Sequence, residues 1–197
     1  MTLGLLLWLI AAQAGSEADN YFHQARQHLE RERAPLALEA IEKVLAIRPD
    51  YPRAHYYAGL AHLKLAEFER AVEEFSSEIK RSPRDGEAHY YRGIAYAARQ
   101  DNARAERDLR RALELVPGSP SVRFQLGKLL IDTGRASDAV ALLEKSIEIQ
   151  PQNPLAHYQL ARAYQQLGRA ADADREFARA RQLQEEERAA AAHSIAR

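Results

Sequence analysis

Four prolines recur at a constant spacing and divide most of the chain into segments of equal length. Each lies 34 residues after the one before: Pro49, Pro83, Pro117 and Pro151. A fixed period of about 20 to 50 residues is typical of solenoid proteins, in which one supersecondary unit is stacked repeatedly. The spacing therefore predicts a repeat architecture before any single residue is interpreted.

The same residue types recur at the same offsets within these segments. Taking each proline as the thirty-second position gives five repeats, at 18–51, 52–85, 86–119, 120–153 and 154–187. Apolar residues spaced by three and four in each half predict two amphipathic helices per repeat. Small residues stand where a helix pair must approach closely, because larger side chains would push the helices apart. They are Ala25, Gly59, Gly93, Gly127 and Ala161 at the eighth position and Ala37, Ala71, Ala105, Ala139 and Ala173 at the twentieth.

Capping residues and prolines predict where the helices begin and end. Ser119-Pro120 and Asn153-Pro154 place a capping side chain before a proline at the first helical position, and Tyr51-Pro52 repeats this with a poorer cap. Asp85 should cap the first helix of the third repeat without a proline after it. The periodic prolines should end the preceding helices. Glu185 replaces the proline in the last repeat, so the last helix should run on into residues 188–197 as a helix extension and a frayed tail.

This pattern resembles the tetratricopeptide repeat (TPR), whose consensus is W-x2-L-G-x2-Y, A-x3-F and P. The second repeat reads His55-x2-Ala58-Gly59-x2-His62, Ala71-x3-Phe75 and Pro83. The chain departs from the consensus in lacking the Trp at the fourth position and in a degenerate first repeat. The resemblance spans residues 18–187 and implies an all-α, right-handed superhelical solenoid of helix-turn-helix repeats.

Composition and motifs narrow the classes of function. Lys plus Arg equals Asp plus Glu, at 28 each, so there is no basic excess for phosphates and we expect no nucleic-acid partner. The absence of cysteine excludes disulfides, thiol nucleophiles and Cys-ligated metals. The chain carries no G-x-S-x-G, H-E-x-x-H, phosphate-binding loop or EF-hand signature. We therefore predict a protein that is not an enzyme and has no catalytic residue, metal or cofactor.

Three histidines share the fourth position of their repeats: His55, His89 and His157. Such a series could form a ladder of metal sites. However, no carboxylate or second histidine follows any of them at three or four residues to complete a ligand set. We predict that these side chains pack and form hydrogen bonds.

The first fourteen residues match a secretory signal peptide in length and order. Leu3 to Ala12 is an apolar run, and Ala12-Gln13-Ala14 supplies an A-x-A cleavage site. A membrane-spanning helix needs about 20 apolar residues, so the run is too short to span a membrane. One feature of a signal peptide is missing, because no Lys or Arg precedes the run. We predict a signal peptide at 1–14 and an exported, periplasmic or secreted protein. An uncleaved membrane tether and an amphipathic or buried helix are the alternatives.

The resemblance implies a concave groove lined by the first helix of each repeat. The fifth position carries an aromatic residue in all five repeats. These rings could be packing between neighbouring first helices, or a stacking surface for a peptide or helix whose carbonyls or acidic side chains meet nearby cations. The candidate peptide-binding residues are Phe22, Arg26, Arg53, Tyr56, Lys64, Tyr90, Phe124, Lys128, Tyr158 and Arg162.

We predict a non-enzymatic scaffold or adaptor that binds a protein or peptide partner in this groove. The inner positions that could clamp a terminal carboxylate hold Tyr57, Glu87 and Tyr91 instead of Lys and Asn, so a free C-terminus is not the expected ligand. One alternative is a homo-oligomerising structural protein that associates through the last helix or the groove. Another is a carbohydrate-binding protein or an enzyme that uses the aromatic row, because such rings also stack on sugars.

Overall fold

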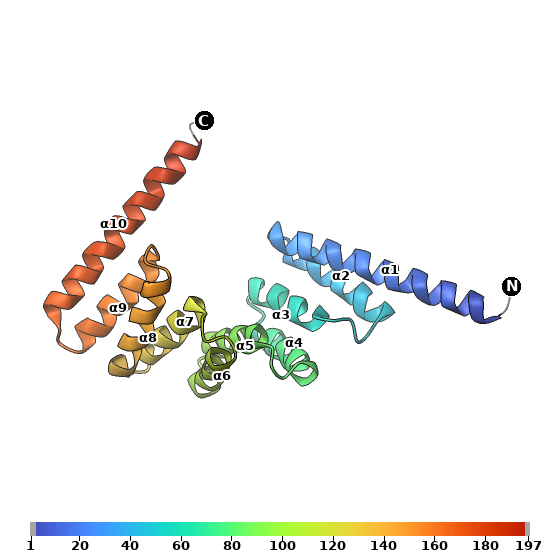
Figure 1. The fold of residues 1–197 in the computed structure, drawn as a ribbon, viewed down its shortest axis with the longest axis horizontal. Coiled ribbons are helices and arrows are strands. Elements are labelled where there is room, and N and C mark those ends of the chain that lie inside the picture. Colours follow the sequence, from blue (N-terminus) through green and yellow to red (C-terminus); the bar gives the residue numbers. More distant parts are fainter. Residues whose placement is uncertain (1–2, 196–197) are drawn as a thin grey trace. The chain divides into compact units, whose positions relative to one another are not determined.

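All secondary structure in the computed structural model is helical over the residues it describes, which are 3–195 for the backbone and 13 and 15–192 for the side chains. The ten helices of this range are α1 (Leu3–Glu30), α2 (Ala34–Ile47), α3 (Ala54–Lys64), α4 (Phe68–Arg81), α5 (Gly86–Ala98), α6 (Asn102–Leu115), α7 (Pro120–Asp132), α8 (Ala136–Ile149), α9 (Pro154–Gln166) and α10 (Ala170–Ile195). The fold class is all-α, as the sequence predicts (Figure 1).

The helices group into two compact units, residues 1–101 and residues 102–197. We call them the N-terminal unit, with α1 to α5, and the C-terminal unit, with α6 to α10. Their boundary falls inside the predicted repeat 86–119, and the division into five repeats stays a prediction. Apart from Gln13, the side chains of the predicted signal peptide lie outside the described residues, as do those of the predicted tail from residue 193.

The periodic prolines terminate helices as predicted. α2, α4, α6 and α8 each end two residues before one of them, at Ile47, Arg81, Leu115 and Ile149. Proline disfavours helical backbone in the residue before it, which explains this constant offset. α10 meets no proline after Ala170 and continues past Glu185 to Ile195.

A shared turn joins the two helices of each pair. Its central residue has a positive φ in all five turns: Glu32, Ala66, Gln100, Gly134 and Gly168. In the turn after α3, Ala66 N–H donates to Leu63 O at 3.0 Å and Glu67 N–H donates to His62 O at 2.9 Å. This pair of bonds is a Schellman motif, which satisfies the last carbonyls of a helix and requires a left-handed residue. Glycine, which adopts a positive φ without strain, occupies this position in two of the turns, whereas the other three carry Glu32, Ala66 and Gln100.

Replacing Ala66 with glycine is expected to stabilise the protein by about 1 kcal/mol. Ala66 has a φ of 57°, and the left-handed region costs an L-residue about 1–2 kcal/mol, part of which the greater chain entropy of glycine offsets. Urea denaturation would measure the change. Ala141→Gly is the matched control, because Ala141 is exposed in the middle of α8, where glycine should destabilise by about 1 kcal/mol. Two shifts of the same sign would contradict the interpretation.

Capping side chains begin the helices at three of the four predicted sites. Asp85 accepts from Ala88 N–H at 3.0 Å, Ser119 accepts from Val122 N–H at 3.3 Å, and Asn153 accepts from the first turn of α9. The prediction of a helix start at Pro52 is wrong. Tyr51 offers no capping acceptor, and α3 begins only at Ala54, after Arg53 with a φ of 61°.

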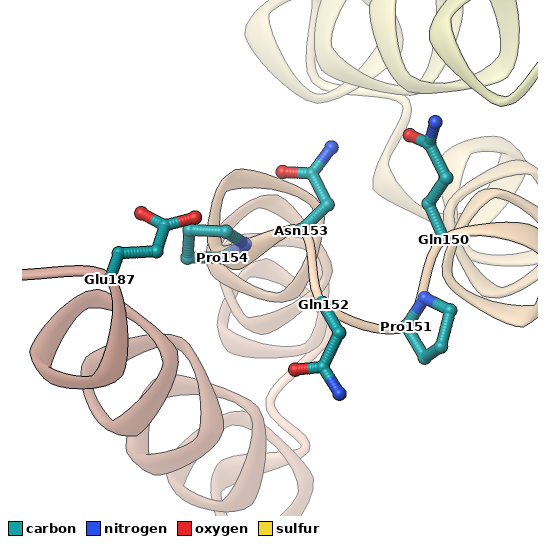
Figure 2. A pocket seen from close by; sticks show the side chains of 6 residues that line it. All are labelled: Gln150, Pro151, Gln152, Asn153, Pro154 and Glu187. Atoms are coloured by element: carbon teal, nitrogen blue, oxygen red, sulfur yellow. The ribbon is translucent and has the colours of Figure 1, made fainter. Parts of the chain in front are cut away.

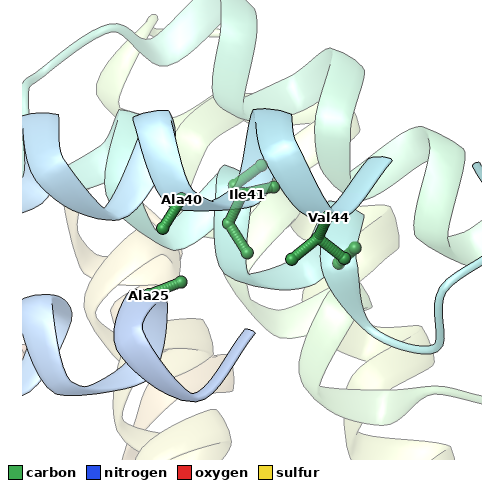
Figure 3. Packing of buried hydrophobic residues seen from close by; sticks show 6 residues of the cluster. Ala25, Ala40, Ile41 and Val44 are labelled. Carbon is green, nitrogen blue, oxygen red and sulfur yellow. The ribbon is translucent and has the colours of Figure 1, made fainter. Parts of the chain in front are cut away.

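Close contacts between paired helices depend on the small residues that the repeat predicts. An added Cβ at Gly59 of α3 would lie 2.7 Å from Cε1 of Phe75 in α4, and one at Gly127 of α7 would lie 2.8 Å from Cγ of Leu143 in α8. Between α1 and α2, Ala25 lies opposite Ala40 and Ile41 in the same way (Figure 3). The first helices of successive pairs also lie beside one another within each unit: α1 contacts α3, α3 contacts α5, and α7 contacts α9.

Among the residues that the structure describes, no helix is long and apolar enough to cross a membrane.

Candidate partner-binding site

The aromatic residues of the predicted groove differ in exposure. Tyr56 is only 5% exposed, and its ring lies 6.0 Å from that of Phe75 and 5.8 Å from that of Tyr91. Burial raises the pKa of its hydroxyl, and the negative charge of nearby Glu87 raises it further. Tyr56 is therefore a core residue of the N-terminal unit and offers no stacking surface, which corrects its assignment as a peptide-binding residue.

Phe22 instead lies at an open pocket between α1, α3 and the loop that joins α2 to α3. Its ring centroid is 4.8 Å from that of Tyr51 and 5.1 Å from that of Tyr57. The pocket has a volume of about 370 Å³ and is lined by Asp19, Phe22, Arg26, Arg48, Tyr51, Pro52, Arg53 and Tyr57. The structure thus brings three predicted site residues, Phe22, Arg26 and Arg53, to one cavity.

Tyr51 closes one side of this pocket. Its hydroxyl donates a hydrogen bond to Asp19 Oδ1 at 2.7 Å, which fixes the loop between α2 and α3 against α1. Burial, together with this hydrogen bond and the charge of Asp19, raises the pKa of Tyr51 to about 12. The hydroxyl therefore stays protonated at neutral pH and keeps its role as donor.

Most of the predicted cations already have carboxylate partners. Lys64 Nζ lies 3.7 Å from Glu32, and Lys128 and Arg162 share Asp132, each at 3.1 Å. Arg53 binds two further carboxylates, Glu87 at 2.7 Å and Asp85 at 3.4 Å. Arg26 differs: it is exposed, its guanidinium carbon lies 5.9 Å from the centre of the Tyr57 ring, and it forms no ion pair with another described residue.

The remaining predicted aromatics lie at separate positions. Tyr90 is half-buried and 4.9 Å from the Tyr91 ring, and Phe124 is half-buried in α7. Tyr158 is 44% exposed and packs edge-on against Phe177 of α10 at 5.5 Å. These two rings border a second pocket of about 380 Å³, to which Asp174 and Arg181 also contribute. No further predicted site residue lines it.

The fourth-position histidines form hydrogen bonds, as predicted. His55 Nδ1 lies 2.7 Å from Glu74, and His157 Nδ1 lies 2.6 Å from Glu176. His89 Nε2 lies 3.3 Å from the carbonyl of Pro83. Within the described residues, no cluster of three or more His, Cys, Asp or Glu side chains could hold a metal ion.

A third pocket lies on the loop between α8 and α9. It has a volume of about 430 Å³ and is lined by Gln150, Pro151, Gln152, Asn153, Pro154 and Glu187. Its side chains do not converge, because Gln150 and Asn153 point to one side of the loop and Gln152 to the other (Figure 2). Asn153 is also engaged in capping α9. This surface therefore has few groups that could hold one ligand.

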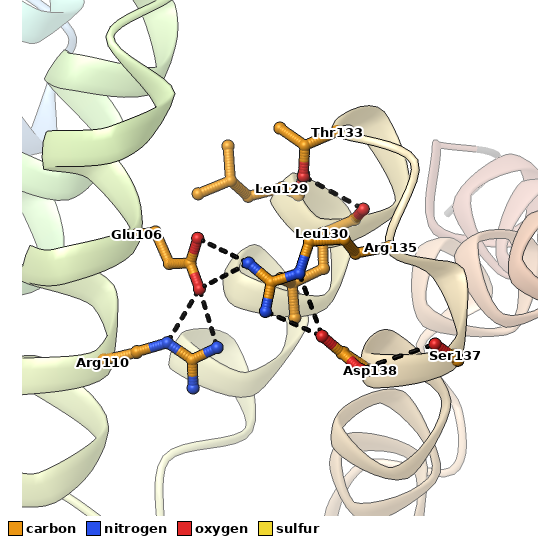
Figure 4. A network of polar contacts seen from close by, with 8 residues as sticks. All are labelled: Glu106, Arg110, Leu129, Leu130, Thr133, Arg135, Ser137 and Asp138. Carbon is orange, nitrogen blue, oxygen red and sulfur yellow. Dashed lines mark hydrogen bonds and ion pairs between the residues drawn. The ribbon is translucent and has the colours of Figure 1, made fainter.

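A polar network of the C-terminal unit also has a structural role. Glu106 of α6 accepts from Arg110 at 2.7 Å and from Arg135 at 2.9 Å, and Arg135 also binds Asp138 at 2.7 Å (Figure 4). Although burial would raise the pKa of Glu106, the hydrogen bonds from the two arginines lower it. The carboxylate thus stays ionised and joins α6 to the start of α8, so these cations are not free for a partner.

Sequence reasoning missed Arg48, Tyr51 and Tyr57 as members of the first pocket. One signal could have identified Tyr51. It occupies the thirty-fourth position of its repeat, where the next three repeats carry the helix caps Asp85, Ser119 and Asn153. A tyrosine in place of a capping residue indicates that this loop makes contacts other than a helix cap, here the hydrogen bond from Tyr51 to Asp19.

Paired helices with a shared turn, small residues at the contacts within α1/α2, α3/α4 and α7/α8, and neighbouring first helices define a helical-repeat protein. Family models of the tetratricopeptide repeat match residues 22–83 and 58–120, residues 96–146, and, under the description TPR repeat, residues 127–168. The chain belongs to the tetratricopeptide repeat family. This membership supports a role in protein–protein interaction.

Solved structures share the fold at low sequence identity. A crystal structure of MamA is 22% identical, covers 83% of this chain and 95% of its own, and has a TM-score of 0.74. A MamA structure from Desulfovibrio magneticus RS-1, spanning residue 41 to the end, is 19% identical, covers 86% and 96%, and has a TM-score of 0.78. No curated protein sequence matches the chain.

Proposed function

We propose that the chain is a non-enzymatic scaffold or adaptor that binds a peptide or helix of a protein partner along its first helices, in an exported compartment. The observation that carries this proposal is the pocket at Phe22. It combines an aromatic lining with Arg26, a cation that no other described residue neutralises. Rings beside a cation suit protein contacts, because aromatic and arginine side chains contribute most to binding energy at interfaces.

A photo-crosslinking experiment tests the binding surface. Benzoylphenylalanine is introduced at position 50, where Asp50 is exposed in the loop beside Tyr51 and does not line the pocket, or at position 43 of α2, where Lys43 is exposed and lies over Tyr21 instead. We expect irradiation of cells to give a discrete protein adduct from position 50 and none from position 43. Equal yields from both positions, or no protein adduct from position 50, would contradict the proposal.

The same adduct separates the alternatives. An adduct of twice the mass of the chain, identified as the chain itself, would favour a homo-oligomer. Binding to a glycan array without any protein adduct would favour a carbohydrate-binding role.

N-terminal sequencing of protein recovered from the exported fraction tests the location, for which we expect a mature chain that starts at Gly15. A chain that still starts at Met1 would contradict cleavage.

A further inference from the structure

The pocket at Phe22 has an aromatic lining from two helices and a loop. Phe22 comes from α1, Tyr57 from α3 and Tyr51 from the loop between α2 and α3. Tyr51 is tilted by 43° against Phe22, and Tyr57 meets Phe22 edge-on at 90°. Such rings provide a rigid apolar surface with polar edges, which favours contact with aromatic or aliphatic side chains.

Two arginines at the pocket have no counter-ion among the described residues. Arg26 lies over the Tyr57 ring at 5.9 Å, and Arg48 lies over the Tyr51 ring at 5.0 Å. Neither forms an ion pair with another described side chain. The third arginine of the pocket, Arg53, is already neutralised by two carboxylates.

The charge balance of the pocket indicates what it can accept. Arg53 is left out of the count because it is paired with Asp85 and Glu87. Among the lining side chains that form no ion pair with a described residue, Arg26 and Arg48 contribute two positive charges, and Asp19, which accepts the Tyr51 hydrogen bond, contributes one negative charge. The surplus of one positive charge matches a single carboxylate better than a phosphate, which carries about two negative charges at neutral pH. Guanidinium groups bind carboxylates in a two-pronged geometry that a planar acid satisfies.

We infer that this pocket, formed by Phe22, Arg26, Arg48, Tyr51 and Tyr57, recognises an internal Asp or Glu side chain beside an aromatic or large aliphatic residue of the partner. The inference rests on the proposed function and names the chemistry of the partner segment. The volume of about 370 Å³ lies at the lower end of the range of about 300–1,000 Å³ for binding pockets, so the pocket suits a short part of a peptide. The carboxylate binds the two arginines and the apolar side chain packs on the rings.

Fluorescence anisotropy with labelled hexapeptides and the full chain tests this. The peptides have the sequence Gly-Ser-X-Z-Ser-Gly with blocked ends, where X is Glu, Gln or phosphoserine and Z is Phe or Ser, and the Glu-Phe peptide is also made with a free C-terminus. We expect the Glu-Phe peptide to bind roughly ten times more tightly than the Gln-Phe or Glu-Ser peptides, because each change removes one of the two contacts. The preference for Glu over Gln should weaken as the salt concentration rises.

Substitutions in the chain separate a specific contact from a general charge effect. Arg26→Gln and Arg48→Gln should each weaken binding of the Glu-Phe peptide several-fold, and the double variant should bind Glu-Phe and Gln-Phe peptides equally. Arg31→Gln is the matched control, because Arg31 is exposed in the turn after α1 and does not line the pocket. It should leave the affinity unchanged, and circular dichroism should show equal helicity in all variants.

Each contrary outcome is distinct. Equal binding of Glu-Phe and Gln-Phe peptides, or equal losses in Arg31→Gln and Arg26→Gln, would overturn the inference while leaving a peptide-binding protein. Tighter binding of the phosphoserine peptide, or binding only to a Glu-Phe peptide with a free C-terminus, would overturn it in favour of those ligands. If no peptide binds although position 50 gives a protein adduct, the inference fails and the proposed function stands. If no peptide binds and position 50 gives no protein adduct, the proposed function fails.

Discussion

Replacing Phe75 with alanine is expected to lower the free energy of unfolding by about 3–5 kcal/mol. The side chain is 0% exposed, and its ring stacks on that of Tyr91 at 6.0 Å with an interplanar angle of 16°. Truncation would remove these contacts and leave a cavity between α4, α3 and α5. Urea denaturation gives the total loss, and hydrogen exchange at the amides of α3 and α4 gives its location, because helical repeats can open locally.

A double-mutant cycle makes this prediction specific. Gly59→Ala alone should destabilise by about 1–3 kcal/mol, because its Cβ would lie 2.7 Å from Cε1 of Phe75. In the Phe75→Ala background the same change should be neutral or stabilising, because the ring is gone and alanine favours helix. Phe68→Ala, at a half-buried phenylalanine of α4, is the control and should lose less. Additive effects of the first two substitutions would show that the glycine and the ring are independent.

Signals that act within a few residues allowed the sequence to predict most of the fold. Proline disfavours helical backbone in the preceding residue whatever the tertiary structure around it. The ends of α2, α4, α6 and α8 therefore follow from Pro49 and the three equivalent prolines. Ser119 and Asn153 cap their helices because a capping side chain acts on the first turn of its own helix.

Features that depend on neighbouring helices were not predicted. Phe22 and Tyr56 hold the same repeat position, yet one borders an open pocket and the other is buried between Phe75 and Tyr91. The repeat pattern specifies the position of a residue but not the size of the side chains that surround it. Glu78 is a further case: it is buried, its Oε2 has no hydrogen-bond partner among the described residues, and burial raises its pKa.

The candidate site was predicted only in part for a related reason. Phe22 and Arg26 follow from positions in the first helix of their repeat, and Arg53 follows from the second position of its repeat, just before α3. Arg48 and Tyr51 belong to the loop, whose path depends on the late start of α3 and on the hydrogen bond to Asp19. A loop that contacts the preceding helix cannot be deduced from a pattern of helix positions, because its conformation is set by non-local contacts.

Replacing Gly127 with leucine is expected to destabilise the C-terminal unit by about 2–3 kcal/mol. A Cβ at this position would lie 2.8 Å from Cγ and 3.0 Å from Cδ2 of Leu143. Leu143 is fully buried, and Cγ is the branch point of its side chain, so it cannot move away without a change of rotamer. The higher helix propensity of leucine offsets only about 1 kcal/mol of this strain.

Gly118→Leu is the matched control for this substitution. Gly118 has no atom within 4 Å of an added Cβ and no positive φ, so leucine there should change stability by less than about 0.5 kcal/mol. Adding Leu143→Ala to Gly127→Leu should restore part of the loss, because the new leucine can occupy the volume that the old one leaves. Thermal unfolding and hydrogen exchange at α7 and α8 measure both effects. Equal losses at Gly118 and Gly127, or no recovery in the double variant, would show that the contact between α7 and α8 does not require glycine.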